Sequence, residues 1–583
     1  MCQMNILLVA VNAKYIHSNP AVFSLKSCTG KYEVYVDIAE FTINQQPSFI
    51  LQQIYKRSPD VIAFSCYIWN RNIIDSIIFD LHKILPDTDI WAGGPEVSYN
   101  ASEMILRWNL RGVMIGPGEG VFSHLVASYV EGVSDRLPSV LDGNASYKLS
   151  LNEIPFWYKN LTDFEHRIIY YESSRGCPFS CSYCLSSIDK CMDFRDVCRV
   201  CNELDFFLSQ NVPQVKFVDR TFNCKKDHAL PILQHILEHD NGITNFHFEI
   251  AADLLDDDYF VLFEKFRPGA VQLEIGVQST CIKTIHEIDR VMDFGKVSYA
   301  VNKISSYKNI HVHLDLIAGL PFEDLSTFQN SFNDVYYLYP EQLQLGFLKV
   351  LKGSNMEIRS INYKLQYTYF PPYEVLSTKW ISYDDICHLK QIEEMVELYY
   401  NSRQFIYTLK FLIEYFDTPY HMYESLASWY EEHDLFGIQL SRLQKYEILL
   451  KFGIDYIRSY MHSSNAISEQ TESLNILIDN KISVLREYIT YDLYLREHMK
   501  NRPFFVPSLE NRKNNIYEIL HNESETHILF PELSDCNYRE LTKILHVEVF
   551  EYIFDKPVAV LFYYDRRDPL TNNCITVKVP VSN

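Results

Sequence analysis

The feature that most constrains the fold is a repeated alternation of short apolar runs with amphipathic stretches. In the middle of the chain, strand-like runs are separated by enough residues for a helix between each pair. The six runs are residues 168–172, 214–219, 245–251, 270–278, 310–319 and 342–350. Strands that alternate with helices predict parallel pairing, and six such units predict a partial (β/α)6 barrel.

The first third of the chain follows the same plan with shorter spacing. Apolar runs at residues 5–11, 32–38, 59–67, 89–95 and 112–116 predict strands, and residues 48–56, 73–85 and 121–129 predict helices. This alternation predicts a doubly wound, flavodoxin-like parallel sheet. Ligands bind such sheets beyond the carboxyl ends of the strands, where Gly93, Gly94, Gly116, Gly118 and Gly120 fall. Their spacing does not match the dinucleotide-binding pattern, so NAD is weakly supported.

The last third, from about residue 370, has long helical patterns rich in tyrosine. We expect helices at residues 383–399, 405–415, 422–433 and 441–459, and closing strands at 548–553, 558–562 and 575–579. The expected domains are 1–140, a linker at 141–165, a core at 166–370 and a mostly helical C-terminal domain at 371–583.

Charge and composition restrict the possible partners and the compartment. Lys and Arg number 53 against 75 Asp and Glu, a net charge of −22, which argues against a nucleic-acid backbone as the partner. No apolar run approaches the roughly 20 residues of a membrane helix. The start of the chain lacks the features of a secretion signal. With 14 cysteines, these features predict a cytoplasmic protein that keeps its thiols reduced.

Cys177, Cys181 and Cys184 lie within eight residues, directly after the first predicted strand of the core. Short runs of thiolates hold iron–sulfur clusters, and three ligands on a 4Fe–4S cube leave one iron open. A structural zinc site would need a second pair of ligands at the usual distance, which is missing. A disulfide does not suit a reducing compartment. These cysteines are therefore the predicted catalytic and metal-binding residues.

The remaining cysteines of the middle region do not predict a second cluster. Cys198 and Cys201 fall in a helical run, and Cys191 and Cys224 fit no ligand spacing. Free cysteine is often a small buried apolar residue. We expect that state for these four.

The Cys-x3-Cys-x2-Cys motif, with Tyr183 before its last cysteine, resembles the signature of the radical S-adenosylmethionine superfamily. The resemblance implies that the open iron binds S-adenosylmethionine and that an electron from the cluster splits it to a 5′-deoxyadenosyl radical. It also implies anaerobic chemistry and an external electron donor of the flavodoxin or ferredoxin type. The substrate, a small molecule or a peptide, is not identified by the resemblance.

The predicted core strands end in polar residues, and buried charge is costly unless it is paired or liganded. The segments 274–279 and 315–321, with Arg290, resemble those that hold S-adenosylmethionine in this superfamily. The resemblance assigns the methionine carboxylate to Arg290. The usual Gly-Gly-Glu segment is missing, which leaves Asp219 as the candidate contact for the amine. The residues implied in binding S-adenosylmethionine are Tyr183, Asp219, Glu249, Glu274, Gln278, Arg290, Asp315 and Gly319.

Segments 65–70, 93–96 and 118–120 resemble the cobalamin-binding domain that precedes the radical core in B12-dependent radical enzymes. The implied cobalamin contacts are Ser65, Tyr67, Trp69, Gly93, Gly94, Pro95, Glu96, Gly116, Gly118, Glu119 and Gly120. The Asp-x-His-x-x-Gly pattern of histidine-ligated cobalamin proteins is absent, and the loop around His17 does not fit it. We therefore expect base-off cobalamin with no protein histidine on cobalt, shielded by Tyr67 or Trp69.

The C-terminal third resembles an uncharacterised domain found behind the core in one bacterial subfamily of these enzymes. The resemblance to B12-dependent radical enzymes implies, as the predicted function, radical methyl transfer to an unactivated carbon. Cobalamin-dependent rearrangement or cyclisation without methyl transfer is an alternative, as is a non-catalytic corrinoid or redox sensor. Methylthiolation would need a second cysteine triad, and Cys2, Cys28 and Cys66 are too scattered to form one.

Overall fold

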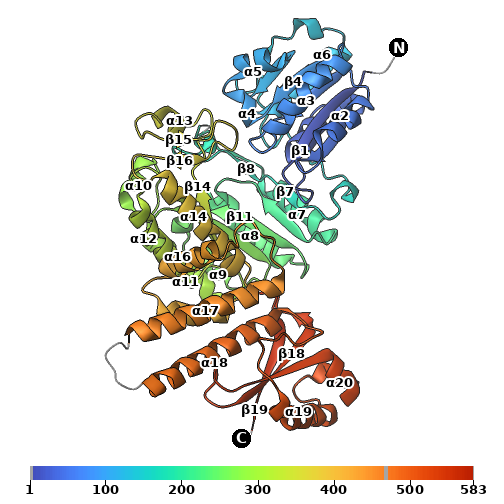
Figure 1. The fold of residues 1–583 in the computed structure, drawn as a ribbon. Coiled ribbons are helices and arrows are strands. Elements are labelled where there is room, and N and C mark those ends of the chain that lie inside the picture. Colours follow the sequence, from blue (N-terminus) through green and yellow to red (C-terminus); the bar gives the residue numbers. More distant parts are fainter. Residues whose placement is uncertain (1–3, 189, 465–470, 582–583) are drawn as a thin grey trace. The chain divides into compact units, whose positions relative to one another are not determined.

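A computed structural model describes residues 4–188, 190–464 and 471–581 (Figure 1). It divides the chain into two compact units. The first runs to Phe328 and includes Leu345–Ile386, and the second is formed by Gln329–Gln344 and the chain from Cys387 onward. Within the described part of the chain, none of the helices has the length and apolar character to cross a lipid bilayer.

The N-terminal part of the first unit is a parallel sheet in the order β2-β1-β3-β4-β5-β6. Its strands are β1 (Ile6–Asn12), β2 (Val36–Thr42), β3 (Val61–Ser65), β4 (Asp89–Gly93), β5 (Gly112–Ile115) and β6 (Val140–Asp142). This is the flavodoxin-like order, and it confirms the predicted doubly wound fold. The predicted strand at 32–38 was placed too early, because Gly30–Tyr35 forms a 3-10 helix and β2 follows it.

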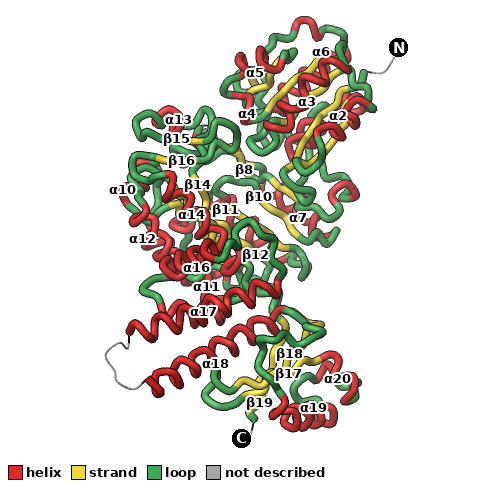
Figure 2. Tube along the Cα trace, in the orientation of Figure 1, coloured by secondary structure: helices red, strands yellow, loops and turns green. Residues whose placement is uncertain are grey.

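Helices cover both faces of this sheet (Figure 2). Leu7, Val9 and Val11 of β1 join a core formed with α2 (Pro47–Tyr55), α3 (Arg71–Ile84) and α5 (Ala101–Trp108). Ile6, Leu8 and Ala10 face the opposite core, formed with α1 (Pro20–Ser27) and α6 (Gly118–Val130). Successive side chains of a strand point to opposite faces, so a strand buried on both faces must be continuously apolar.

The second sheet of the first unit has the order β14-β13-β12-β11-β10-β7. Its strands are β7 (Ile169–Tyr171), β10 (Gln214–Phe217), β11 (Asn245–Ile250), β12 (Val271–Gln278), β13 (His311–Ala318) and β14 (Gln342–Phe347). Between them run α7 (Val197–Ser209), α8 (Lys226–Glu238), α9 (Asp257–Phe263), α10 (Ile282–Glu287), α11 (Phe294–Tyr307) and α12 (Leu325–Tyr336). All six predicted strands are present, in chain order across the sheet, as a partial barrel requires.

Residues 172–196, between β7 and α7, include the three cysteines, and we call them the cysteine segment. Two short strands in this segment, β8 (Ser174–Arg175) and β9 (Asp193–Phe194), pair with each other. The chain then continues past β14 through α13 (Asn355–Arg359) and a second pair of short strands, β15 (Gln366–Tyr367) with β16 (Val375–Ser377). Both pairs of strands belong to the first unit.

The second unit is mostly helical, as predicted, and includes most of α14 (Tyr383–Met395). Its other main helices are α15 (Ile406–Leu412), α16 (Pro419–Glu432), α17 (Arg442–Ser464), α18 (Thr471–Arg496), α19 (Lys513–Thr526) and α20 (Tyr538–Ile544). The closing antiparallel sheet is β17 (Leu545–Phe550), β18 (Val558–Arg567) and β19 (Cys574–Pro580). The sequence reasoning missed α18, whose second half is rich in Tyr, Ile and Thr, residues that favour strands.

Candidate active site

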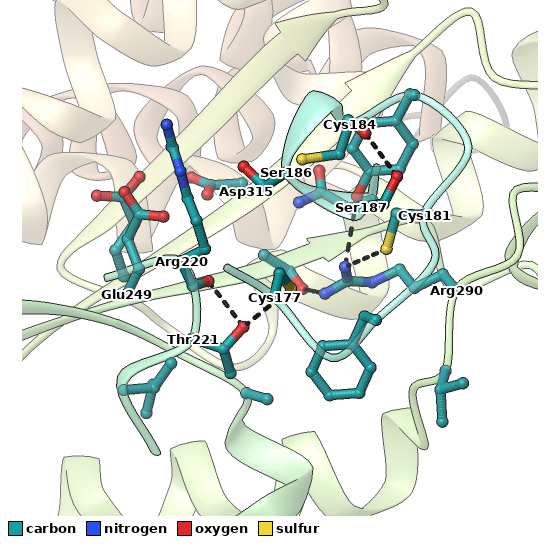
Figure 3. A pocket seen from close by; sticks show the side chains of 18 of the residues that line it. Cys177, Cys181, Cys184, Ser186, Ser187, Arg220, Thr221, Glu249, Arg290 and Asp315 are labelled. Carbon is teal, nitrogen blue, oxygen red and sulfur yellow. Dashed lines mark hydrogen bonds between the residues drawn. The ribbon is translucent and has the colours of Figure 1, made fainter. Parts of the chain in front are cut away.

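The carboxyl ends of β10 to β13 and the cysteine segment enclose a cavity of about 870 Å³, the core cavity (Figure 3). Parallel strands end at the same edge of a sheet, which brings residues far apart in sequence to one place. The predicted site residues that line it are Cys177, Cys181, Tyr183, Cys184, Glu249, Glu274, Gln278, Arg290 and Asp315.

The three cysteine sulfurs do not form the compact group that a single metal ion needs. A tetrahedral zinc with bonds of about 2.3 Å would hold its sulfurs about 4 Å apart. Among the described residues, these sulfurs are not one of the groups whose donor atoms all lie within 4.8 Å of one another. Burial raises the pKa of the Cys181 thiol, and the Arg290 guanidinium 3.6 Å from its sulfur acts in the opposite direction. The donor set fits a cluster held by thiolates.

Arg290 follows α10 and is held in the wall of the core cavity by the chain itself. Its guanidinium donates to the Gly276 carbonyl, to the Tyr183 hydroxyl at 3.3 Å and to the Cys181 sulfur. Its Nε atom is buried and has no hydrogen-bond partner in the described part of the chain. The Oε1 atom of Gln278 is in the same state, on a backbone with φ of +73°. Buried polar atoms without partners are rare and point to a missing ligand.

The carboxylates of this cavity have different environments. Burial raises the pKa of Glu249 to about 7, although Arg220 lowers it. Burial would also raise the pKa of Glu274, but His247 at 2.9 Å and Lys216 at 3.1 Å lower it to about 2. Glu274 is therefore ionised at neutral pH, while Glu249 titrates near pH 7.

Asp315 is the third carboxylate of this cavity, in the carboxyl half of β13. Burial raises its pKa, and His313, at 2.9 Å, acts in the opposite direction. The strands therefore present three half-buried acids whose proton affinities differ with their neighbours.

Two predicted contacts of S-adenosylmethionine lie outside the lining of this cavity. Asp219 is fully buried and accepts hydrogen bonds from the Ser173 amide at 2.8 Å and from the Ser173 and Ser174 hydroxyls at 2.6 Å. It fastens the end of β10 to the start of the cysteine segment. Gly319 has φ of +87°, and a side chain there would meet Val375.

A second cavity, of about 1800 Å³ and open to solvent, lies beyond the strand ends of the N-terminal sheet; we call it the N-terminal cavity. The predicted residues that line it are Ser65, Tyr67, Gly93, Gly94, Pro95, Gly116, Gly118 and Glu119. At Gly94 the backbone has φ of +106°, and a Cβ atom would lie 2.5 Å from the Cys66 carbonyl oxygen. A glycine is needed for the chain to pass so close.

Three predicted cobalamin contacts, Trp69, Glu96 and Gly120, are not part of this lining. Trp69 stacks on Tyr67 with ring centroids 4.3 Å apart and supports it. Glu96 is buried and accepts a hydrogen bond from the Tyr373 hydroxyl. At Gly120 a Cβ atom would meet the carbonyl oxygen of Tyr147.

His17 also lies outside the lining of the N-terminal cavity. Its Nδ1 atom is 2.6 Å from the Tyr170 hydroxyl, and it lines a smaller apolar cavity together with Tyr67 and Trp69.

The sequence reasoning missed the residues that connect the two cavities. Ser186 and Arg220 line both of them. Arg175 of the cysteine segment lines the N-terminal cavity and pairs with Glu119 at 2.8 Å. Arg220 directly follows the predicted strand at residues 214–219 and is one of the polar residues at the ends of the core strands. The sequence does not show the direction of its side chain.

The other cysteines of the core correct an expectation. We expected Cys191, Cys198, Cys201 and Cys224 to be small buried residues, but Cys191 and Cys198 are exposed and the other two are half-buried. Cys198 and Cys201 do lie on a helix, α7. Apolar packing therefore does not explain these four residues.

Comparison with known proteins agrees with this arrangement. A family model described as B12 binding domain matches residues 6–126, and one described as Protein of unknown function (DUF4080) matches residues 361–562. The chain thus combines a B12-binding domain, a core of the radical S-adenosylmethionine fold and a C-terminal DUF4080 domain.

Two curated relatives are methyltransferases. The cobalamin-dependent radical SAM methyltransferase TokK of Streptomyces tokunonensis is 24% identical over 326 residues, which cover 49% of this chain and 47% of TokK. The 2-(S-pantetheinyl)-carbapenam-3-carboxylate methyltransferase of Streptantibioticus cattleyicolor is 24% identical over 328 residues, with the same coverage. The chain spans about half the length of these relatives and is homologous to them.

Solved structures share the fold. The cobalamin-dependent S-adenosylmethionine radical enzyme OxsB, with aqua-cobalamin and S-adenosylmethionine bound, aligns with a TM-score of 0.54 at 12% identity over 84% of each chain. The methyltransferase TsrM of Kitasatospora setae, with cobalamin and a 4Fe–4S cluster bound, aligns with a TM-score of 0.51 at 15% identity over 62% of this chain and 78% of TsrM.

Proposed function

We propose that this chain is a cobalamin-dependent radical S-adenosylmethionine methyltransferase that acts on an unactivated carbon. The observation that carries the proposal is that two cavities, one lined by three cysteines and one by the glycines of a B12-binding domain, share Ser186 and Arg220. When bound, the cluster and S-adenosylmethionine supply one-electron chemistry and cobalamin carries the methyl group. The chain positions these groups side by side and keeps water from them.

In the core cavity, Cys177, Cys181 and Cys184 hold the cluster. The Nε atom of Arg290, which the chain leaves without a partner, donates a charge-assisted hydrogen bond to the carboxylate of S-adenosylmethionine. Gln278 offers its unpartnered oxygen as a hydrogen-bond acceptor to the ligand. These assignments use the atoms that the fold leaves without partners.

Two carboxylates of the same cavity complete this part of the proposal. Glu249 and Asp315 accept hydrogen bonds from the ribose or amine groups of S-adenosylmethionine. Both are half-buried acids that line the core cavity, and burial raises the pKa of each.

In the N-terminal cavity, the backbone at Gly93, Gly94 and Gly116 gives a flat corrin ring room to approach the strand ends. Tyr67, supported by the stacked Trp69, presents an aromatic face to the same space. Since His17 lies outside this lining, we propose that no protein histidine binds the cobalt.

The product tests the reaction class. Protein loaded with the cluster and cobalamin is given methyl-labelled S-adenosylmethionine, a reductant of the flavodoxin type and a small-molecule extract of the source cells. Labelled product together with S-adenosylhomocysteine supports methyl transfer. 5′-Deoxyadenosine without a labelled product supports rearrangement or cyclisation, and cofactor binding without any product supports a sensor.

A further inference from the structure

Three arginines line the two cavities, and the chain uses two of them for its own structure. Arg175 is bound by the carboxylates of Glu119 at 2.8 Å and Glu172 at 2.6 Å. Arg290 donates to a carbonyl, a hydroxyl and a sulfur in the cavity wall. The guanidinium of Arg220 has neither a hydrogen bond nor an ion pair with any residue that the structure describes.

The backbone at Arg220 is nevertheless fixed. The preceding residue, Asp219, is fully buried and held by two serines, and the Thr221 hydroxyl donates to the Arg220 carbonyl at 2.8 Å. Figure 3 shows the side chain extending from this anchored turn past Glu249. The guanidinium is near enough to Glu249 to lower the pKa of that acid, but it forms no hydrogen bond or ion pair with it. A fixed backbone that presents a long cation of this kind is suited to bind a charged group from outside the chain.

The position of Arg220 favours the substrate as the source of that group. Arg220 lines both the core cavity and the N-terminal cavity, and Ser186 is the other residue that does so. A molecule that receives a methyl group must reach the space between the two cofactors. Arg220 is exposed where the two cavities adjoin, so its charge is accessible to a molecule that enters there.

We infer that Arg220 binds an anionic group, a carboxylate or a phosphate, of the methyl-accepting substrate. This inference rests on the proposed function, and it names the substrate class as acidic small molecules or acidic parts of larger ones. The planar guanidinium fork binds both kinds of anion through paired hydrogen bonds. The same chemistry is present in the carboxylate of S-adenosylmethionine and in the phosphate of cobalamin, so the test must separate three sources.

The first experiment asks whether Arg220 binds a cofactor. Arg220→Gln and the control Arg136→Gln, an exposed position in a 3-10 helix away from both cavities, are loaded with cluster and cobalamin. The S-adenosylmethionine affinity measured by calorimetry is expected to change less than fivefold in Arg220→Gln, through the lost effect of this charge on Glu249, and less than twofold in Arg136→Gln. The absorbance of bound cobalamin is expected to change less than twofold in both variants. A tenfold loss of either cofactor only in Arg220→Gln would assign the guanidinium to that cofactor and overturn the inference.

The second experiment asks what Arg220 binds, without requiring turnover. A small-molecule extract of the source cells is separated on an anion exchanger into retained and unretained fractions. Each fraction is filtered with loaded protein, and the compounds that stay with the protein are identified by mass spectrometry. We expect a compound from the retained fraction with wild-type protein and with Arg136→Gln, at least tenfold less with Arg220→Gln, and partial recovery with Arg220→Lys. Retention of a neutral compound only, of no compound, or of equal amounts by all variants would overturn the inference.

The two failures are distinguishable. If the retained anion binds but never accepts a labelled methyl group, the proposed methyl transfer fails while Arg220 remains an anion-binding residue. If methyl transfer occurs to a neutral compound at equal rates in wild type and Arg220→Gln, the proposed function stands and the role of Arg220 fails.

Discussion

The two cavities of the first unit are built by different means. The lining of the N-terminal cavity includes several glycines, and at Gly94 a side chain would collide with the Cys66 backbone. The core cavity is lined by carboxylates, two arginines and thiols, many of which are held by neighbours. A broad, flat ligand needs space and close approach, whereas a small charged ligand needs oriented charges. Changes of volume should therefore damage one cavity, and changes of charge the other.

The largest expected effect is loss of the cluster. Changing Cys177, Cys181 and Cys184 together to Ala should abolish iron and sulfide binding, because no thiolate ligand remains in the core cavity. Cobalamin binding should persist, since these side chains are absent from the lining of the N-terminal cavity. Iron analysis and the absorbance of bound cobalamin check both parts, and an iron–sulfur signal that survives the triple change would show a second cluster.

A methyl group at Gly94 should damage only the N-terminal cavity. In Gly94→Ala the new Cβ would lie 2.5 Å from the Cys66 oxygen, so the backbone must move, and we expect cobalamin binding to fall at least tenfold. Gly132→Ala is the matched control, because Gly132 also has a positive φ, of +71°, but has no atom within 4 Å of the new Cβ. Equal loss of cobalamin in both variants would mean that strain, not the shape of the cavity, causes the effect.

Removing a charge should damage only the core cavity. Arg290→Ala is expected to weaken S-adenosylmethionine binding by on the order of 2 kcal/mol, or roughly thirtyfold, through loss of a charge-assisted hydrogen bond. Calorimetry measures the change, and cobalamin absorbance should stay the same. Unchanged affinity would show that Arg290 only orders the Cys181 and Tyr183 side chains.

A smaller effect is expected in the pH dependence of S-adenosylmethionine binding. Because the pKa of Glu249 is raised to about 7, this acid is mostly protonated at pH 6 and mostly ionised at pH 8. The ionised form attracts the positive charge of S-adenosylmethionine and accepts stronger hydrogen bonds, so affinity should rise roughly fivefold over this interval, about 1 kcal/mol. Glu249→Gln should remove this part of the rise. An identical pH profile in wild type and variant would exclude Glu249 as its source.

The smallest expected effect is none. His17→Ala should leave the electron paramagnetic resonance spectrum of the cob(II)alamin form unchanged, because His17 lies outside the N-terminal cavity and contacts Tyr170. Nitrogen splitting that disappears in the variant would identify His17 as a ligand of cobalt.

The sequence predicted the sheet strands of the first unit well, because apolar runs and their spacing report directly on buried parallel strands. It also placed Glu249 and Gln278 correctly at strand ends, whereas Asp315 lies three residues before the end of its strand. Position at a strand end does not determine where a side chain points. Asp219 satisfies that pattern, yet Ser173 and Ser174 from a neighbouring segment take up its carboxylate.

Side-chain direction also explains why Glu96 and Trp69 do not line the N-terminal cavity. Glu96 follows two glycines that line the cavity, but its carboxylate pairs with Tyr373, which is 277 residues away in the chain. Trp69 lies two residues from Tyr67 and stacks behind it. Partners distant in sequence decide which member of a motif faces a ligand, and a single sequence gives no direct sign of them.

The pairing of Arg175 with both Glu119 and Glu172 has a consequence for the order of assembly. One guanidinium connects the first turn of α6 in the B12-binding domain to the segment that carries the three cysteines. A ligand in the N-terminal cavity that stabilises the ion pair of Arg175 and Glu119 would also hold the cysteine segment in the position that binding in the core cavity needs. By thermodynamic linkage, whatever help the occupied N-terminal cavity gives to binding in the core cavity must be returned by the same factor. Filling of the two cavities would then be cooperative, with partly loaded molecules less frequent than independent sites would give.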